Sequence, residues 1–176
     1  ALLGLAIVTL GQDASAAMLE LGAAAGTTGG ANLTLPMTLT PGNGESVVAL
    51  QFDLTWDITE LTIVTFALGS ASTTASKTLN GSILGPGHMR FIVAGINQTV
   101  IAAGDVFDVT MKINSGAAAG PQSVDVTGVL LANPHGQSVA VTVTSGLITI
   151  GPGRVHNADT NHDYRISLSE LLRLIQ

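Results

Sequence analysis

The chain has 176 residues, a net charge of −6, only six Lys and Arg residues, and no Cys. That length suits one all-β domain with a short appendage. So few basic residues cannot neutralise a run of phosphates, which excludes nucleic acids and anionic membranes as principal partners, and the lack of Cys excludes disulfides and thiolate metal sites.

Residues 1–16, ALLGLAIVTLGQDASA, have the pattern of a partial secretory signal. An apolar run of about eleven residues precedes the small-x-small site formed by Ala14, Ser15 and Ala16. The run is too short to cross a bilayer roughly 30 Å thick as a helix. We therefore expect cleavage after Ala16 and a secreted protein whose gene product begins upstream of Ala1. The alternative is that this run forms a buried first strand.

Residues 17–150 alternate short apolar runs with Gly, Asn, Pro and Ser, which is the spacing of an antiparallel β-sandwich. Aromatic residues make up only 3% of the chain, so the core must be built mainly from Val, Leu, Ile and Ala, which favours strands. The pattern predicts about nine strands, the last of them broken at Ser145 and Gly146. Their expected ranges are 18–21, 32–40, 47–56, 61–67, 76–79, 89–94, 105–114, 122–132 and 139–150. The glycine-rich stretch 26–30 is expected to be a flexible loop.

The clearest predicted strand is 47–56, because its apolar residues alternate strictly. Leu50, Phe52, Leu54 and Trp56 share one parity, and the opposite parity holds Ala49, Gln51, Asp53 and Thr55. One face of this strand is therefore expected to be buried in the core. The other face is expected to meet water or a partner.

The sequence contains no arrangement that favours catalysis. Asp53 and Asp57 would lie roughly 13 Å apart along a strand, beyond the roughly 5 to 9.5 Å that a glycosidase pair needs. Asp105 and Asp108, three residues apart, are expected to point to opposite faces of a strand. The histidines fall in predicted loops and are expected to be ordinary surface residues, at positions His88, His135, His156 and His162. We therefore expect a protein that is not an enzyme.

Four segments of the sandwich stand in a recognisable order: V-V-A-L-Q-F-D-L-T-W-D, H-M-R-F-I-V-A-G, G-D-V-F-D-V-T-M-K-I, and V-L-L-A-N-P-H-G-Q-S-V-A-V-T-V-T-S-G-L-I-T-I. In this order and spacing they resemble the cohesin domain of cellulosomal scaffold proteins, over about residues 18–150. The resemblance implies a nine-stranded antiparallel jelly roll, an extracellular setting and a non-catalytic task, the binding of a dockerin module on another protein. Cohesins bind through outward residues of the third strand and its neighbours, which here correspond to Ala49, Gln51, Asp53 and Thr55.

After a short linker at 151–158, residues 159–176 begin with D-T-N-H-D-Y-R-I-S-L-S-E, an EF-hand-like loop. Oxygen donors at loop positions 1, 3, 5, 7, 9 and 12 are the arrangement that wraps Ca²⁺. The donors here are Asp159, Asn161, Asp163, the carbonyl of Arg165, Ser167 and Glu170. The alternative is an Asp/Asn-rich helix cap without metal.

The loop and the helix expected after it resemble one of the two calcium-loop halves of a dockerin. Dockerin halves recognise their partner through residues late in the loop, so the resemblance implies that Leu168 and Ser169 would contact a partner. Only one half is present before Gln176, so we expect Ca²⁺ binding to be weak in this chain and the gene product to continue with the second half. The competing interpretation of the whole chain is a carbohydrate-binding sandwich with a polysaccharide ligand. It is disfavoured because the only Trp, Trp56, shares the buried parity.

Overall fold

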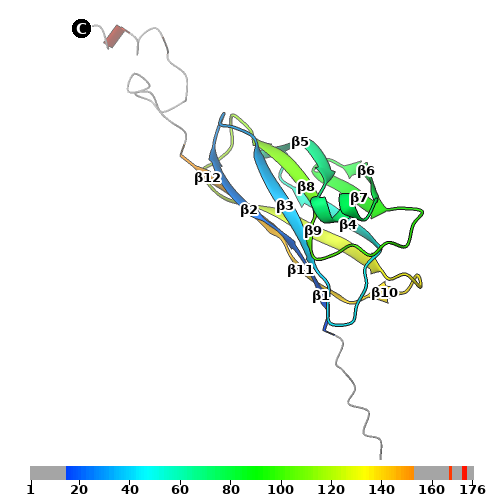
Figure 1. The fold of residues 1–176 in the computed structure, drawn as a ribbon. Coiled ribbons are helices and arrows are strands. Elements are labelled where there is room, and N and C mark those ends of the chain that lie inside the picture. The colour runs from blue at the N-terminus through cyan, green and yellow to red at the C-terminus, as the bar shows by residue number, and fades with distance from the viewer. Residues whose placement is uncertain (1–14, 153–166, 168–171, 174–176) are drawn as a thin grey trace, which may run out of the picture.

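The computed structural model describes residues 15–152, 167 and 172–173, and within them the chain folds into two packed β-sheets (Figure 1). The first sheet has the strand order β11 (Val141–Thr144), β1 (Ala17–Leu21), β3 (Leu33–Thr40), β8 (Gly104–Ile113) and β5 (Leu61–Leu68). The second has the order β2 (Ala23–Thr27), β12 (Gly146–Gly151), β9 (Gly120–Ala132), β4 (Ala49–Trp56), β7 (His88–Ala94) and β6 (Thr78–Gly85). The short strand β10 (Ser138–Val139) pairs with β9, and one short helix, α1 (Ser70–Thr74), precedes β6.

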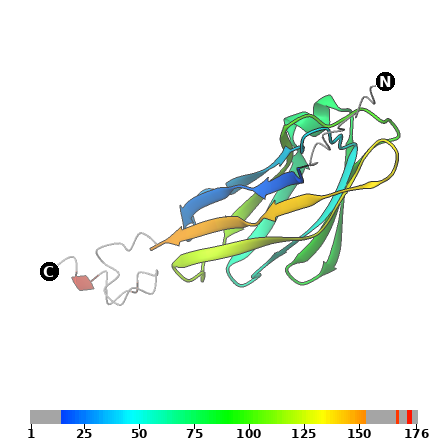
Figure 2. The same ribbon diagram turned by 90° about the horizontal axis from the view of Figure 1, so that it is seen from below.

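This architecture confirms the all-β jelly-roll sandwich expected from the sequence. The described chain enters the sandwich at one end and leaves it at the other (Figures 1 and 2). Within the described residues no helix is long and apolar enough to cross a membrane.

The first and last segments of the sandwich each contribute to both sheets. The chain crosses between sheets at Gly22, and β1 and β2 pair in parallel with β11 and β12. The return crossing, at Ser145 and Gly146, confirms the break predicted there. A Cβ on Gly146 would lie 2.8 Å from the Leu21 side chain, so only glycine allows the two crossing segments to approach this closely. These parallel pairs were not predicted, and strand β2 replaces part of the expected flexible loop.

The core lies between the sheets and is centred on the phenylalanines. All four Phe residues of the chain join one cluster, in which Phe107 lies 5.0 Å from Phe52 and 4.7 Å from Phe91 between ring centroids. Phe66 packs edge-on against Phe91 at 5.0 Å. Leu50, Phe52 and Leu54 are at most 1% exposed, as their parity predicts. The cluster therefore joins the two sheets, because Phe66 and Phe107 belong to the first sheet and Phe52 and Phe91 to the second.

The strand expected at 76–79 is displaced and longer in the structure. It begins at Thr78, because Ser76 adopts a positive φ of 55°, and it continues to Gly85. Gly81 lies in its middle, and a Cβ there would lie 2.9 Å from Phe66 and 3.1 Å from Phe91. Glycine therefore makes room for the aromatic cluster, although in the sequence it looks like the end of a strand.

Candidate partner-binding face

The outer surface of β9, β4, β7 and β6 forms a nearly continuous sheet face, which we call the docking face. Gln51 of β4 is paired with Ile92 of β7 on one side and with Leu130 of β9 on the other. Ile92 is 41% exposed and Leu130 58% exposed, although both are large aliphatic residues. They border a shallow groove of about 280 Å³ whose lining includes Ala49, Gln51, Ile92, Leu130 and Ser138. This row of the face therefore presents one amide with an exposed aliphatic side chain on each side of it.

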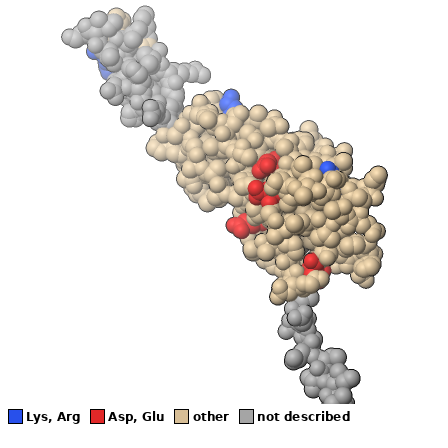
Figure 3. Space-filling view, viewed as in Figure 1, with Lys and Arg blue, Asp and Glu red and all other residues tan. Residues whose placement is uncertain are grey.

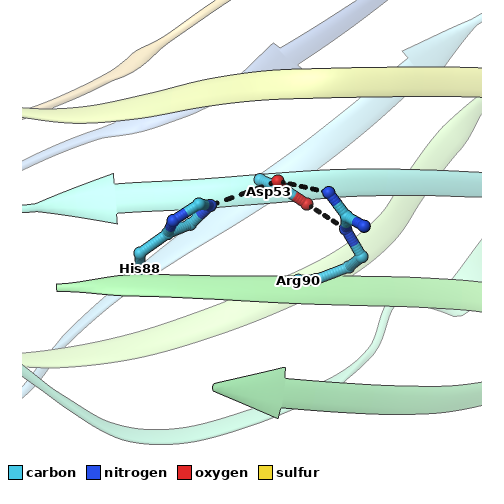
Figure 4. Close-up of polar contacts among 3 residues, drawn as sticks. All are labelled: Asp53, His88 and Arg90. Carbon is cyan, nitrogen blue, oxygen red and sulfur yellow. Dashed lines mark hydrogen bonds and ion pairs between the residues drawn. The ribbon is translucent and has the colours of Figure 1, made fainter. Parts of the chain in front are cut away.

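The next row of the docking face holds an ion pair in which the carboxylate is buried and the guanidinium is partly exposed (Figure 4). Arg90 donates two hydrogen bonds to the Asp53 carboxylate, from Nε to Oδ1 at 2.7 Å and from Nη2 to Oδ2 at 2.9 Å. His88 Nε2 lies 3.1 Å from Asp53 Oδ2. The hydrogen bonds from Arg90 hold the pKa of Asp53 below its usual value despite the opposing effect of burial, and Asp53 in turn raises the pKa of Arg90. The pair neutralises itself, so the centre of the face carries little net charge.

A β-bulge on β9 covers Asp53 from the other side. The pairing of β4 with β9 shifts between Gln51 and Asp53, and Gly128 lies in the bulge with a φ of 59°. A Cβ on Gly128 would lie 3.2 Å from Asp53 Oδ2. Glycine is therefore favoured there both by the left-handed backbone and by the close carboxylate.

The structure places the predicted partner residues on one face but corrects the environment of one of them. Ala49, Gln51 and Thr55 are half-buried, as residues on the outer face of a central strand should be. Asp53 is only 5% exposed, whereas its face of the strand was expected to meet water or a partner. Strand alternation places Asp53 on the outer face, but it cannot reveal that Arg90 and the bulge cover it.

Sequence reasoning missed Ile92, Leu130, Arg90 and His88 as members of this face. His88 was expected in a loop, but it begins β7 and contacts Asp53. The four residues become neighbours only through the register of β7 and β9 against β4. Alternation within the segment 89–94 was the one available signal, because it places Arg90 and Ile92 on the face opposite to Phe91.

The other carboxylates that were considered for catalysis, Asp57, Asp105 and Asp108, lie in a turn and on strand β8. Asp57 accepts hydrogen bonds from the backbone N–H and the hydroxyl of Thr59, both at 2.7 Å, and these bonds lower its pKa. Asp105 and Asp108 were expected on opposite faces, which is wrong. The register of β3 against β8 skips one residue of β8, Val106, so the alternation is reset between the two carboxylates. Burial and then the charge of Asp105 raise the pKa of Asp108.

Charged side chains are sparse on the surface seen in Figure 3, where acidic groups outnumber basic ones. The described part of the chain contains no cluster of three or more His, Cys, Asp or Glu side chains placed so that they could hold a metal ion. The predicted calcium ligands lie outside the described residues, apart from Ser167. Most of the predicted secretory signal also lies outside them, and Ser15 and Ala16 are exposed residues that precede β1.

No residue in the described part of the chain presents an aromatic platform for a sugar. Phe52, Phe91 and Phe107 are fully buried, and Trp56 and Phe66 are partly buried against the core. Sugar-binding surfaces rely on exposed rings that stack on the ligand. The carbohydrate-binding alternative therefore gains no support from the structure.

Comparison with known proteins gives a family and a fold. A family model described as "Cohesin domain" matches residues 18–150. The fold is similar to that of the sixth cohesin of Acetivibrio cellulolyticus scaffoldin B, solved in complex with a Cel5 dockerin, with a TM-score of 0.68 and 19% identity over 78% of this chain and 100% of the other. No curated protein sequence matches the chain.

Two further solved structures show the same fold in proteins from other organisms. The cohesin CaCohA2 of Clostridium acetobutylicum has a TM-score of 0.69 and 16% identity, over 80% of this chain and 94% of the other. A non-cellulosomal cohesin from the archaeon Archaeoglobus fulgidus has a TM-score of 0.63 and 16% identity, over 86% of this chain and 100% of the other.

Proposed function

Because this chain belongs to the cohesin domain family, we propose that it is an assembly module that binds a dockerin through its docking face. Cohesin domains are non-catalytic protein-interaction modules, so family membership confirms the expectation that the chain is not an enzyme. The observation that carries the proposal is the row in which exposed Ile92 and Leu130 flank Gln51 beside a neutralised ion pair. The predicted partner residues Ala49, Gln51 and Thr55 belong to this surface.

The chemistry of the docking face favours a helix with a mixed surface as its ligand. Ile92 and Leu130 offer apolar area to be covered, and Gln51 offers both a hydrogen-bond donor and an acceptor. Asp53 is buried beneath Arg90 and His88, so its proposed contribution is to hold the guanidinium and the imidazole in place. A surface that combines exposed aliphatic side chains with polar neighbours is typical of specific protein interfaces.

Affinity capture with matched variants tests this proposal. Immobilised wild-type protein is expected to retain, from the secreted proteins of its source organism in calcium buffer, a protein with paired calcium-loop repeats, and EDTA is expected to release it. Gln51→Arg combined with Leu130→Glu should abolish capture, whereas Ile83→Glu, on the edge of β6, should not. Equal capture by the two variants would exclude the docking face. Binding of the wild type to cellulose instead would favour the carbohydrate alternative.

We also propose that the protein is secreted after cleavage following Ala16. Ala17 is the first residue of β1, and its N–H donates to the carbonyl of Ala140 at 2.8 Å. Cleavage before Ala17 would leave the entire strand in place. When the protein is secreted with a restored leader, mass spectrometry should give Ala17 as the first residue. A secreted chain that retains residues 1–11 would favour an additional strand instead.

The C-terminal loop is proposed to bind Ca²⁺ weakly through Asp159, Asn161, Asp163, the Arg165 carbonyl, Ser167 and Glu170. This proposal rests on the spacing of the oxygen donors in the sequence. Calorimetric titration with Ca²⁺ should give little heat with this chain. A clear signal should appear when a second calcium-loop repeat is fused after Gln176, and Asp159→Ala or Glu170→Ala should remove it. If the fused protein gives no calorimetric signal with Ca²⁺, only the interpretation as a helix cap without metal would remain.

A further inference from the structure

An apolar groove of about 710 Å³ lies between β5 and β6, the edge strands of the two sheets. Its walls are formed by side chains without charge, among them Trp56, Ile63, Val64, Phe66, Ile83 and Met89. Ile83 is 78% exposed and Val64 49% exposed. Among the described residues, nothing covers this groove, and it lies apart from the row of Gln51, Ile92 and Leu130. We call it the edge groove.

The two edges of the groove are poorly suited to receive an additional strand. Val64 of β5 has no paired residue on β8, and Leu84 of β6 has none on β7, so each edge carries a bulge. Bulges twist an edge strand and interrupt the regular ladder that a new strand needs. The groove is therefore better suited to side chains inserted from a helix than to a strand that adds backbone hydrogen bonds.

The chain itself contains an apolar stripe that fits such a groove. Leu168, Leu171, Leu172 and Ile175 follow the spacing i, i+3, i+4, i+7, which places them on one side of a helix, away from Arg173. Leu172 and Arg173 are helical in the structure, and Leu172 is 53% exposed. The stripe and the groove are both apolar and uncharged, and the described part of the structure leaves the groove and Leu172 exposed.

The C-terminal segment can reach the edge groove from the end of β12. Ile150 pairs with Gly120, and Glu60, which precedes the groove-lining residue Leu61, accepts a hydrogen bond from Ala118 N–H at 2.7 Å. The end of β12 and this mouth of the groove therefore lie at the same end of the sandwich. Four strand spacings separate β12 from β6, about 20 Å. The fourteen residues 153–166 can span up to about 46 Å.

We propose that residues 168–175 dock as a helix in the edge groove of the same chain, with the apolar stripe inserted between β5 and β6. Docking removes the exposed surfaces of Leu172, Val64 and Ile83 from water together. It also makes the stripe unavailable to any second helix, so the sandwich and such a helix compete for the C-terminal segment. This proposal does not depend on dockerin binding at the docking face.

Cysteine cross-linking in the full chain tests the proposal directly, because the sequence has no Cys of its own. Under mild oxidation, Ile83→Cys combined with Leu172→Cys should form an intrachain disulfide at least about tenfold faster than Ile92→Cys combined with Leu172→Cys, because docking raises the local concentration above that of a flexible tether. Ile92 is a suitable control because it is an exposed residue of the docking face. Equal rates for the two pairs would overturn the proposal. Disulfides formed only between chains would also overturn it, in favour of a second copy as the occupant.

The fluorescence of Trp56 provides an independent readout, since it is the only tryptophan and lines the edge groove. Leu172→Glu should shift its emission to longer wavelength and increase its quenching by acrylamide. Arg173→Gln, beside the stripe, should change neither. Unchanged emission and quenching in Leu172→Glu would refute docking. Capture of a partner by the docking face should be unaffected by Leu172→Glu, so a failure of either proposal can be told from a failure of the other.

Discussion

Removing the two exposed aliphatic side chains of the docking face should weaken partner binding by a predictable amount. Ile92 and Leu130 are 41% and 58% exposed, so together they leave about one large aliphatic side chain in water. Complete burial of one such side chain contributes about 1.5–3 kcal/mol. Ile92→Ala with Leu130→Ala is therefore expected to raise the Kd for the dockerin partner roughly 10- to 150-fold.

Calorimetric titration of the captured dockerin module into each variant measures this change. Ile96→Ala is the matched control, because Ile96 is another exposed aliphatic residue but lies in the loop after β7. Its Kd should stay within about threefold of wild type, because exposed substitutions usually change free energies by no more than about 0.5 kcal/mol. Thermal unfolding should confirm that both variants remain folded. An unchanged Kd for the double variant, with the control also unchanged, would refute the assignment of this row as the contact.

Four further substitutions, one of them a control, test the internal energetics of the sandwich, each followed by urea unfolding. Asp53→Asn should be destabilising at pH 7 and lose its effect on acidification, because a lowered pKa stabilises the folded state only above about pH 4 and that stability is lost as the pH falls through the folded-state pKa. Asp108→Asn should have the opposite sign: burial raises this pKa, so the substitution should stabilise at pH 7 and become neutral below about pH 4. Gly81→Ala should cost about 1–3 kcal/mol through its clash with Phe66, whereas Gly85→Ala, with open space around it, should cost much less. Equal pH profiles for the two Asp variants, or equal costs for the two Gly variants, would contradict these assignments.

Local alternation was sufficient to identify the sheet elements that are long and apolar on one face. Leu50, Phe52 and Leu54 are buried as their parity predicts, and the break at Ser145 and Gly146 separates β11 from β12. These features depend on the two-residue period of a strand and on the freedom of glycine, both of which act within a few residues. The order of such segments was also enough to indicate the family.

The composition of the docking face was decided only by tertiary structure. Ile92 and Leu130 flank Gln51 because β7 and β9 pair with β4 in one register, and Asp53 is buried because Arg90 and the bulge at Gly128 cover it. A bulge shifts every later residue of a strand to the other face, as it does between Asp105 and Asp108. The alternation of apolar and polar residues in a single strand does not indicate where such a shift occurs.

The strands with the least strand-like sequences could not be predicted from the sequence either. β2 has the sequence Ala-Ala-Ala-Gly-Thr, with little intrinsic preference for a strand, and it is ordered by parallel pairing with β12, more than a hundred residues later in the chain. β6 continues through Gly81 because the aromatic cluster needs the space that a side chain would take. The sequence by itself thus determined which segments have a buried face. Contacts between distant segments decided which strands pair, where bulges fall and which side chains meet on the surface, because pairing free energy is realised only once the two sheets are packed together.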